Sequence, residues 1–356
     1  MKLSSLFILG IATIKLYFLW MPCTPFIIPG RIARYGVTSN VHRSLAHSST
    51  SLQSQILDFI EPTTGVSVKL IGTMHYNPAS IKLAEDTINK LEAEGKLGSI
   101  IIESCDIRWN ATLENDLVKS ALQSEMRAAH DLGLFYNRPV VLGDQRINVT
   151  VNKLTEGAKE AVVDLFNPIG GWGRLYRSIA AARTVAVPFG ENYLGLDSFF
   201  DPKLLGASPV SLIKYPLSYI VRSPIFGVAL IAFVFLTELS DVSEGSSFLT
   251  TPESASDLLV SVFFSFLETI IFARIFLKEL LAERNEVLAI NILEQCKNYQ
   301  SGDKNTLFSL LQSNRDKSNG AIYAKDSVVG KPEKNKTVVA VLGLAHCNGI
   351  KKIMTD

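Results

Sequence analysis

A pattern that occurs twice constrains the fold of this chain more than any other feature. It is an apolar run rich in β-branched residues, followed by a glycine and, three residues later, a histidine. The first copy, Val68–His75, ends in Gly-Thr-Met-His, and the second, Val338–His346, ends in Gly-Leu-Ala-His. Short apolar runs of this composition are typical of strands that are buried on both faces of a sheet. Each copy therefore predicts a buried strand that carries an imidazole at its carboxyl end.

Two further apolar runs end on a carboxylate, one on Glu103 and the other on Asp144. Between His75 and Glu103, a helix-start signal at Asn77 and apolar residues at helical spacing predict a strand–helix–strand unit. A second helix, predicted over 112–132, leads to the strand that ends at Asp144. On this helix His130 lies beside Asp131, and we expect it to be a surface residue. Because the carboxyl ends of parallel strands meet at the edge of an open sheet where ligands bind, we expect one shared crevice.

The first 57 residues have the composition of a targeting leader. They contain no Asp or Glu, and an apolar stretch, Leu6–Trp20, is followed by a segment rich in Arg and Ser. This combination predicts import into an organelle, a plastid or a mitochondrion, with the secretory pathway as the alternative. Passage through the secretory route would place sugars on the sequons at Asn110, Asn148 or Asn335.

The remainder divides by composition into three parts. Residues 58–160 and 283–356 carry the strand patterns and predict the two halves of one α/β domain, with a mixed or parallel central sheet and flanking helices. Residues 161–282 predict a helical, apolar insertion between the halves. Within it, 217–237 and 258–277 are apolar enough to suggest either a membrane hairpin or a helical cap over the site, and the pattern does not separate these two interpretations.

Composition also excludes several functions. A formal net charge of +1 and the lack of a nucleic-acid-binding module argue against nucleic acid as a partner. No phosphate-binding glycine loop and no G-x-S-x-G nucleophile elbow is present, so a serine hydrolase is not expected. The four cysteines are too scattered for a disulfide framework, and we interpret them as thiols in a packed interior.

The candidate site consists of His75, Glu103 and His346. Two imidazoles and a carboxylate are a ligand set for zinc, manganese, cobalt or iron, and a metal-bound water would serve as a nucleophile at neutral pH. Glu103 could be a ligand or the general base. The alternatives are that the histidines are ordinary strand-end residues and that Arg108 is simply the ion-pair partner of Glu103. Asp144 also has two interpretations: it forms an ion pair with Arg146, or it holds the metal ligands in position through hydrogen bonds.

In this order and context, the motifs resemble the TraB/PrgY family, which is related to the Tiki proteins. The segments that carry the resemblance are 68–75, 101–108, 124–133, 140–146, 283–285 and 339–350. The resemblance implies a metal-dependent hydrolase scaffold in which His75, Glu103 and His346 bind a divalent ion. It also implies that Glu103, Arg108, Arg284 and Asn285 work in catalysis or support it. In bacterial members a hydrophobic membrane region follows the second motif, whereas in this chain the apolar segments precede it.

Two functions follow as hypotheses. The first is an organellar, membrane-associated, metal-dependent hydrolase, a peptidase acting on peptides or a hydrolase acting on another small-molecule substrate. Tiki proteins are membrane-anchored peptidases, and PrgY lowers the activity of a peptide pheromone. The second is a non-catalytic regulatory protein that captures a peptide or another ligand in the same crevice. Turnover separates the two, because only an enzyme yields a product.

Overall fold

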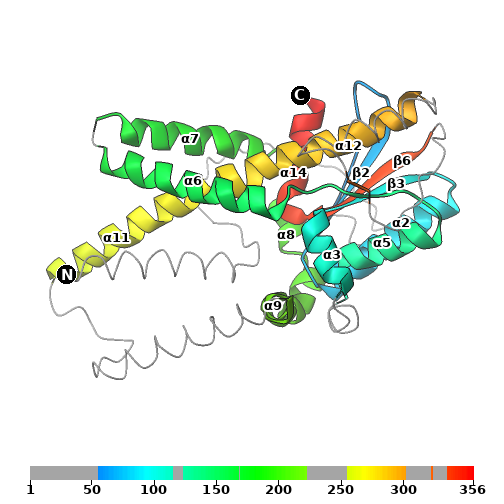
Figure 1. Cartoon of the computed structure of the whole chain (residues 1–356), viewed down its shortest axis with the longest axis horizontal. Helices are drawn as coiled ribbons and strands as arrows, with labels where there is room; N and C mark the ends of the chain where they lie inside the picture. The colour runs from blue at the N-terminus through cyan, green and yellow to red at the C-terminus, as the bar shows by residue number, and fades with distance from the viewer. Residues whose placement is uncertain (1–54, 115–122, 168, 223–254, 302–321, 324–334) are drawn as a thin grey trace, which may run out of the picture.

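The structure is a computed structural model that describes residues 55–114, 123–167, 169–222, 255–301, 322–323 and 335–356 (Figure 1). The predicted leader lies outside the described residues, apart from its last three positions. Most of the apolar segment 217–237 lies outside them too. The described part contains a sheet with helices on both faces and a group of long helices that extends away from the sheet.

The sheet has six strands in the order β1-β2-β6-β3-β4-β5. Their bounds are β1 Ile56–Ile60, β2 Ser67–Thr73, β3 Leu97–Ile102, β4 Val140–Leu142, β5 Ile322–Tyr323 and β6 Thr337–Gly343. The four inner strands β2, β6, β3 and β4 are parallel, and the edge strands β1 and β5 are antiparallel to their neighbours. The predicted mixed α/β sheet is therefore confirmed. The strands that carry the two histidine patterns, β2 and β6, lie next to each other.

Register explains why the ends of these strands coincide. In the β2–β6 pair Thr73 lies opposite Gly343, and in the neighbouring pairs Ile102 of β3 lies opposite Val341 and Leu142. All residues of β3, β4 and β6 are buried, as expected for parallel strands covered on both faces. The segments that follow the four inner strands therefore begin at the same edge of the sheet.

Side chains that alternate along the strands form two separate cores. One face of the sheet, with Leu70, Ile101 and Leu342, packs against helices α12 (Glu283–Ser301) and α14 (Leu344–Thr355). The opposite face packs against α2 (Pro78–Ala93) and α5 (Glu125–Phe135). Its buried strand residues in this core are Ile71, Leu97, Ile100, Ile102, Val140, Leu142, Val339 and Val341. Burial on both sides fixes the register, because a shift by one residue would exchange the two sets of side chains.

Helix α2 confirms the helix predicted after His75. The Oδ1 atom of Asn77 accepts a hydrogen bond from the backbone N–H of Ala79 at 2.9 Å, and Pro78 occupies the first helical position. Gly95 follows the helix with a φ of +66°, a conformation that suits a residue without a Cβ.

The single helix predicted over 112–132 is wrong. The structure has α3 (Asp106–Glu114) and a separate α5, and residues 115–122 lie outside the described part. The division is visible at Ser124, whose backbone is extended and whose Oγ accepts a hydrogen bond from the N–H of Arg127 at 3.3 Å. Ser124 is thus an N-cap that starts a new helix in the middle of the expected one.

The predicted insertion is helical in its described part. Two of its helices, α7 (Gly171–Ala186) and α11 (Ala255–Arg274), form what we call the helical arm together with α6 (Ile147–Phe166), which begins in the first half of the domain and ends in the insertion. The arm extends from the sheet toward the left of Figure 1. The short α8 (Leu196–Phe199) and the longer α9 (Pro202–Arg222) lie nearer to the sheet (Figure 1).

Helix α11 leads without a break into a π-helical segment, η2 (Ile275–Ala282), and then into α12. One continuous helical rod therefore joins the arm to the sheet (Figure 1). Among the described helices, none combines the length and the apolar character needed to cross a bilayer.

Candidate functional site

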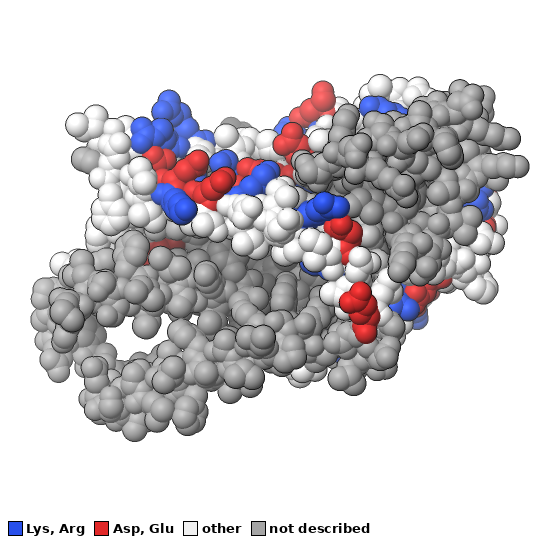
Figure 2. Space-filling view, in the orientation of Figure 1, with Lys and Arg blue, Asp and Glu red and all other residues white. Residues whose placement is uncertain are grey.

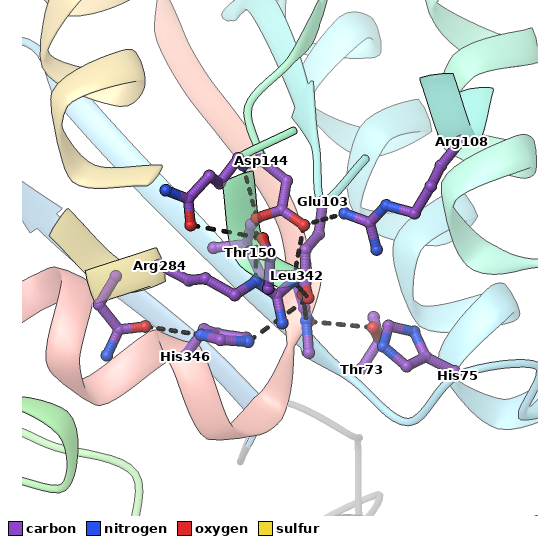
Figure 3. A network of polar contacts seen from close by, with 12 residues as sticks. Thr73, His75, Glu103, Arg108, Asp144, Thr150, Arg284, Leu342 and His346 are labelled. Carbon is purple, nitrogen blue, oxygen red and sulfur yellow. Dashed lines mark hydrogen bonds and ion pairs between the residues drawn. The ribbon is translucent and has the colours of Figure 1, made fainter. Parts of the chain in front are cut away.

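The ends of the four inner strands place the predicted side chains in one network (Figure 3). Glu103 and Asp144 follow β3 and β4, and His75 follows β2. His346 lies in the first turn of α14, which begins directly after β6. The expectation that parallel topology collects these groups at one edge agrees with the structure. The same network includes Arg108 from α3, and Arg284 and Asn285 from the first turn of α12.

His75 is held by Glu125, the first residue of α5. Its Nδ1 lies 2.7 Å from Glu125 Oε1, and the backbone N–H of Tyr76 donates to Oε2 of the same carboxylate at 3.1 Å. Tyr76 has a φ of 59°, an uncommon value for a residue with a side chain. Burial alone would lower the pKa of His75, but the hydrogen bond and charge of Glu125, with the charge of Glu103, raise it above its ordinary value.

His346 is held in a similar way by Asn285. Its Nδ1 lies 2.6 Å from Oδ1 of Asn285, an acceptor, so we assign the Nδ1 proton to this contact. Its Nε2 lies 3.4 Å from Oε1 of Glu103. Both histidines thus use Nδ1 to bind a side-chain oxygen, and this arrangement leaves Nε2 of each ring for the crevice.

Glu103 lies between the histidines and is almost fully buried. Its Oε2 accepts the backbone N–H of Gly343 at 2.6 Å, and its Oε1 accepts a hydrogen bond from Arg284 at 2.5 Å. Burial would raise the pKa of this carboxyl, but the charges of His346 and Arg284 hold it well below its usual range. Glu103 is therefore ionised at neutral pH.

Gly343 is the point on which these groups converge. A Cβ atom at this position would lie 3.2 Å from Oε2 of Glu103, 3.6 Å from Cδ2 of His346 and 3.7 Å from Nε2 of His75. The absence of a side chain thus leaves space in front of the carboxylate and both rings. The glycine that precedes each histidine in the sequence pattern has this steric role in the second copy.

Arg284 joins the two buried carboxylates. Its Nε and Nη2 bind Oδ1 and Oδ2 of Asp144 at 3.0 and 2.6 Å, while Nη2 also binds Glu103. Asp144, which has no exposed side-chain surface, also binds Arg108 and accepts the backbone N–H of Gln145 at 2.8 Å. Burial would raise the pKa of Asp144, but Arg284 and Arg108 lower it.

Two ion pairs that the sequence offered as alternative interpretations have other partners in this network. Arg108 pairs with Asp144 rather than with Glu103, because α3 carries it past the end of β3 toward the end of β4. Arg146 does not pair with Asp144 but with Asp106, at 2.8 Å. His130, which its neighbour Asp131 would place on the surface, is instead buried, with its ring 4.7 Å from that of Trp109.

The formal charges of the network leave one negative charge in excess when the histidines are neutral. Three carboxylates, those of Glu103, Glu125 and Asp144, face two guanidinium groups, those of Arg108 and Arg284. A buried excess charge is unfavourable unless a further positive charge compensates for it. A proton on a histidine or a bound cation would supply that charge.

The donor chemistry of the site suits a metal ion, although its geometry is not that of an assembled cluster. Within the described residues, no three His, Cys, Asp or Glu side chains are grouped closely enough to form a metal site. Metal-binding imidazoles usually donate their other N–H to a carboxylate or carbonyl oxygen, as His75 and His346 do here. The third donor, Glu103, is engaged by Arg284.

Sequence patterns did not identify two residues that contact His75. Glu125 fixes its Nδ1, and the one available signal was an acidic residue directly after a helix cap. Tyr215 of α9 stacks on the imidazole, with ring centroids 5.9 Å apart and planes inclined by 9°. No local pattern points to Tyr215, because the contact joins the insertion to the first half of the domain.

The cysteines were also predicted, as thiols in a packed interior. Cys105, Cys296 and Cys347 are free thiols in the interior, as expected, and Cys23 lies outside the described residues.

Comparison of the chain with protein-family models gives no match, and comparison with curated proteins gives none either.

Proposed function

We propose that the chain is a metal-dependent hydrolase that acts on peptides. In this proposal His75, His346 and Glu103 hold a divalent cation, which could be Mn, Co, Zn or Fe. One observation carries the proposal: two imidazoles that follow the ends of adjacent parallel strands each bind a side-chain oxygen through Nδ1 and lie around Gly343 with the Glu103 carboxylate. A bound divalent ion would polarise a carbonyl group and lower the pKa of a bound water.

The electrostatics assign different tasks to the polar residues. A carboxylate whose pKa is held well below its usual range is a weak proton acceptor near neutral pH, so Glu103 is better suited as a ligand than as a general base. Arg284 and Arg108 keep Glu103 and Asp144 ionised and in position. Although burial alone would lower the pKa of His75, the hydrogen bond and charge of Glu125 raise it.

Peptides are proposed as the substrate class because of the resemblance to the TraB/PrgY and Tiki proteins. The accessible parts of the site are consistent with an extended ligand. About a third of the Arg108 side chain and a smaller part of the His75 ring are exposed, while Glu103 and Asp144 are buried behind them. The exposed part of Arg108 offers a donor for a carbonyl or carboxylate group of a substrate.

The second candidate is a non-catalytic regulatory protein that binds a peptide or another ligand in the same crevice. The ion pair between Arg284 and Glu103 favours it, because this pair already occupies the carboxylate that a metal would need. Such a protein would bind its ligand without forming a product.

Metal content and turnover separate these candidates. We expect the purified full-length chain, reconstituted with each of the four metals, to retain a near-stoichiometric amount of one of them by mass spectrometry. The double variant His75→Ala/His346→Ala should lose it while keeping its circular dichroism spectrum. The variant His42→Ala/His47→Ala removes the same number of imidazoles from the leader and serves as the matched control.

A peptide library then tests catalysis. Cleavage that requires both the metal and the two site histidines would support the hydrolase. Metal retention that does not depend on His75 and His346 would refute the proposed site. Peptide binding without any product would favour the regulatory protein.

A further inference from the structure

We propose that the helical arm is a docking surface for an anionic lipid bilayer. This inference is independent of the proposed catalytic function, because it rests on the far end of α6, α7 and α11 rather than on the crevice. Three features of the arm carry it: an exposed aromatic turn, an apolar stripe on α11, and a basic groove that contains an unpaired guanidinium nitrogen.

The turn between α6 and α7 exposes large apolar and aromatic side chains. Ile169 is 87% exposed and Tyr176 is 74% exposed, and Phe166 and Trp172 are exposed beside them in the sequence. Clusters of this kind are unusual on a freely solvated surface and mark contacts with proteins or membranes. Trp and Tyr together are enriched where a protein meets the headgroup region of a bilayer.

The first half of α11 adds an apolar stripe near this turn. Its exposed residues recur at i, i+3, i+4 and i+7 and therefore share one side of the helix: Leu259, Val262, Phe263 and Phe266. The next turns of α11, with Leu267 and Ile270, pack against Leu165 and Leu175 of the α6–α7 hairpin. The apolar face of α11 thus continues past the residues that the hairpin covers. Figure 1 shows the start of α11 and the α6–α7 turn at the end of the arm away from the sheet.

Positive charge lies directly behind this apolar end. Helix α7 contains Arg174, Arg177 and Arg183 and no Asp or Glu. In Figure 2 the end of the arm shows white side chains, and blue and red ones lie together immediately behind it; the red ones include carboxylates of α6. An apolar tip with adjacent basic residues is the composition of segments that lie in the interface of an anionic membrane.

A groove between the three helices provides a place for a phosphate group. It has a volume of about 440 Å³ and is lined by Lys159, Glu160, Val163, Asp164, Arg174, Ser178 and Arg274. Its three cationic side chains outnumber its two carboxylates. Asp164 binds Arg174 at 2.7 Å, and Glu160 binds Nη2 of Arg274 at 2.7 Å.

Arg274 is the member of this groove whose guanidinium group is only partly satisfied, because its Nε has no acceptor among the described residues. It is only 4% exposed, and its Nη1 donates to the backbone oxygen of Gly157 at 2.8 Å. Among the described residues, no acceptor contacts its Nε. A buried donor without an acceptor is costly, and a phosphate oxygen that enters the groove would satisfy it. Val163, which is exposed, extends the groove toward the apolar turn, where acyl chains would lie.

Trp172 is an intrinsic fluorescent probe for contact between the arm and a bilayer. The chain has three tryptophans, of which Trp109 is buried in the sheet domain and Trp20 lies in the leader. The full-length protein is mixed with vesicles of brominated phosphatidylcholine, with or without phosphatidylglycerol, and the quenching of fluorescence is compared with that of Trp172→Phe. The difference reports Trp172 alone, even if the leader also binds lipid. We expect Trp172 to be quenched by the vesicles that contain phosphatidylglycerol, and less so at high salt.

Variants of the arm test which side chains are responsible. Each basic residue close to an anionic surface contributes on the order of a fivefold increase in partitioning. Lys159→Gln/Arg177→Gln should therefore weaken binding by roughly 30-fold. Phe166→Ser/Ile169→Ser should weaken binding at both salt concentrations. Phe135→Ser removes an equally exposed aromatic ring from α5, outside the arm, and should have no effect.

Three results would overturn the proposal. The first is the absence of Trp172 quenching in either vesicle, and the second is an equal loss of binding in the arm variants and in Phe135→Ser. The third is light scattering that shows a dimer without lipid, dissociated by Phe166→Ser/Ile169→Ser, because the apolar end would then be covered by a second copy of the chain.

Discussion

Arg284→Met should destabilise the protein strongly at neutral pH, and lowering the pH should remove part of the effect. The substitution keeps an unbranched apolar side chain that ends near the position of Nε, but it removes three charge-assisted hydrogen bonds, one to Glu103 and two to Asp144. Both carboxylates remain buried. Removing one partner of a buried ion pair costs about 3–5 kcal/mol, since the charge that remains is no longer compensated.

The sign of the pH dependence follows from the lowered pKa values. In the native protein the pKa values of Glu103 and Asp144 lie below those of the unfolded chain. Their ionised forms therefore contribute stability above the unfolded pKa, about 4, and this contribution is lost as the pH falls through the native pKa. Without Arg284 the native pKa values rise toward or above the unfolded ones. The difference in unfolding free energy between the two proteins should then shrink between pH 7 and about pH 4.

Urea unfolding followed by circular dichroism at several pH values measures this difference. The matched control is Arg138→Met, which removes a two-hydrogen-bond contact with Glu92, at 3.0 and 3.0 Å, between partly exposed side chains outside the site. It should cost about 1 kcal/mol or less, since exposed ion pairs contribute little. Equal losses in the two variants, or a loss in Arg284→Met that is the same at every pH, would refute the electrostatic account of the network.

Three further predictions concern the site and the core. Asn285→Ala should lower metal affinity by about 10–100-fold while the chain stays folded, measured by competition with a chelator, because His346 loses the oxygen that orients its ring. Gly343→Ala should weaken metal binding with a smaller effect on unfolding temperature, because alanine tolerates a φ of −57° while its Cβ would reach into the crevice. Unchanged metal affinity would mean that the metal binds elsewhere. Burial raises the pKa of Cys296 to about 12 and also raises that of Cys347. Iodoacetamide should therefore label both thiols only on unfolding, and stability should fall as the pH rises above about 9, where the unfolded thiols ionise.

The strands and their common edge could be predicted because they depend on local composition and on a general rule of parallel sheets. Val338–His346 contains all that is needed for a buried strand that ends in a glycine turn. The cap at Asn77 was also local, so helix α2 was placed correctly. Ser124 had the same kind of signal, but the apolar spacing on either side of it favoured a single long helix.

Side-chain partners were harder to predict because sequence distance does not determine spatial distance. Arg108 is five residues from Glu103 and was the obvious partner, yet Arg284 from the second half of the domain takes that place. Glu125 reaches His75 only because α5 packs beside α2 on one face of the sheet. His130 looked like a surface residue because it precedes Asp131, and nothing local indicated that Trp109 would cover its ring.

The π-helical segment η2 makes the orientation of the site residues on α12 sensitive to the number of residues in the rod that joins the arm to the site. A π-helical turn contains more residues than an α-helical turn. The direction in which side chains after Ala282 point therefore depends on the number of residues in this segment. Deletion of a single residue from 275–282 would rotate Arg284 and Asn285 by about 100° around the helix axis. A length change that many surface helices would tolerate should here abolish the network.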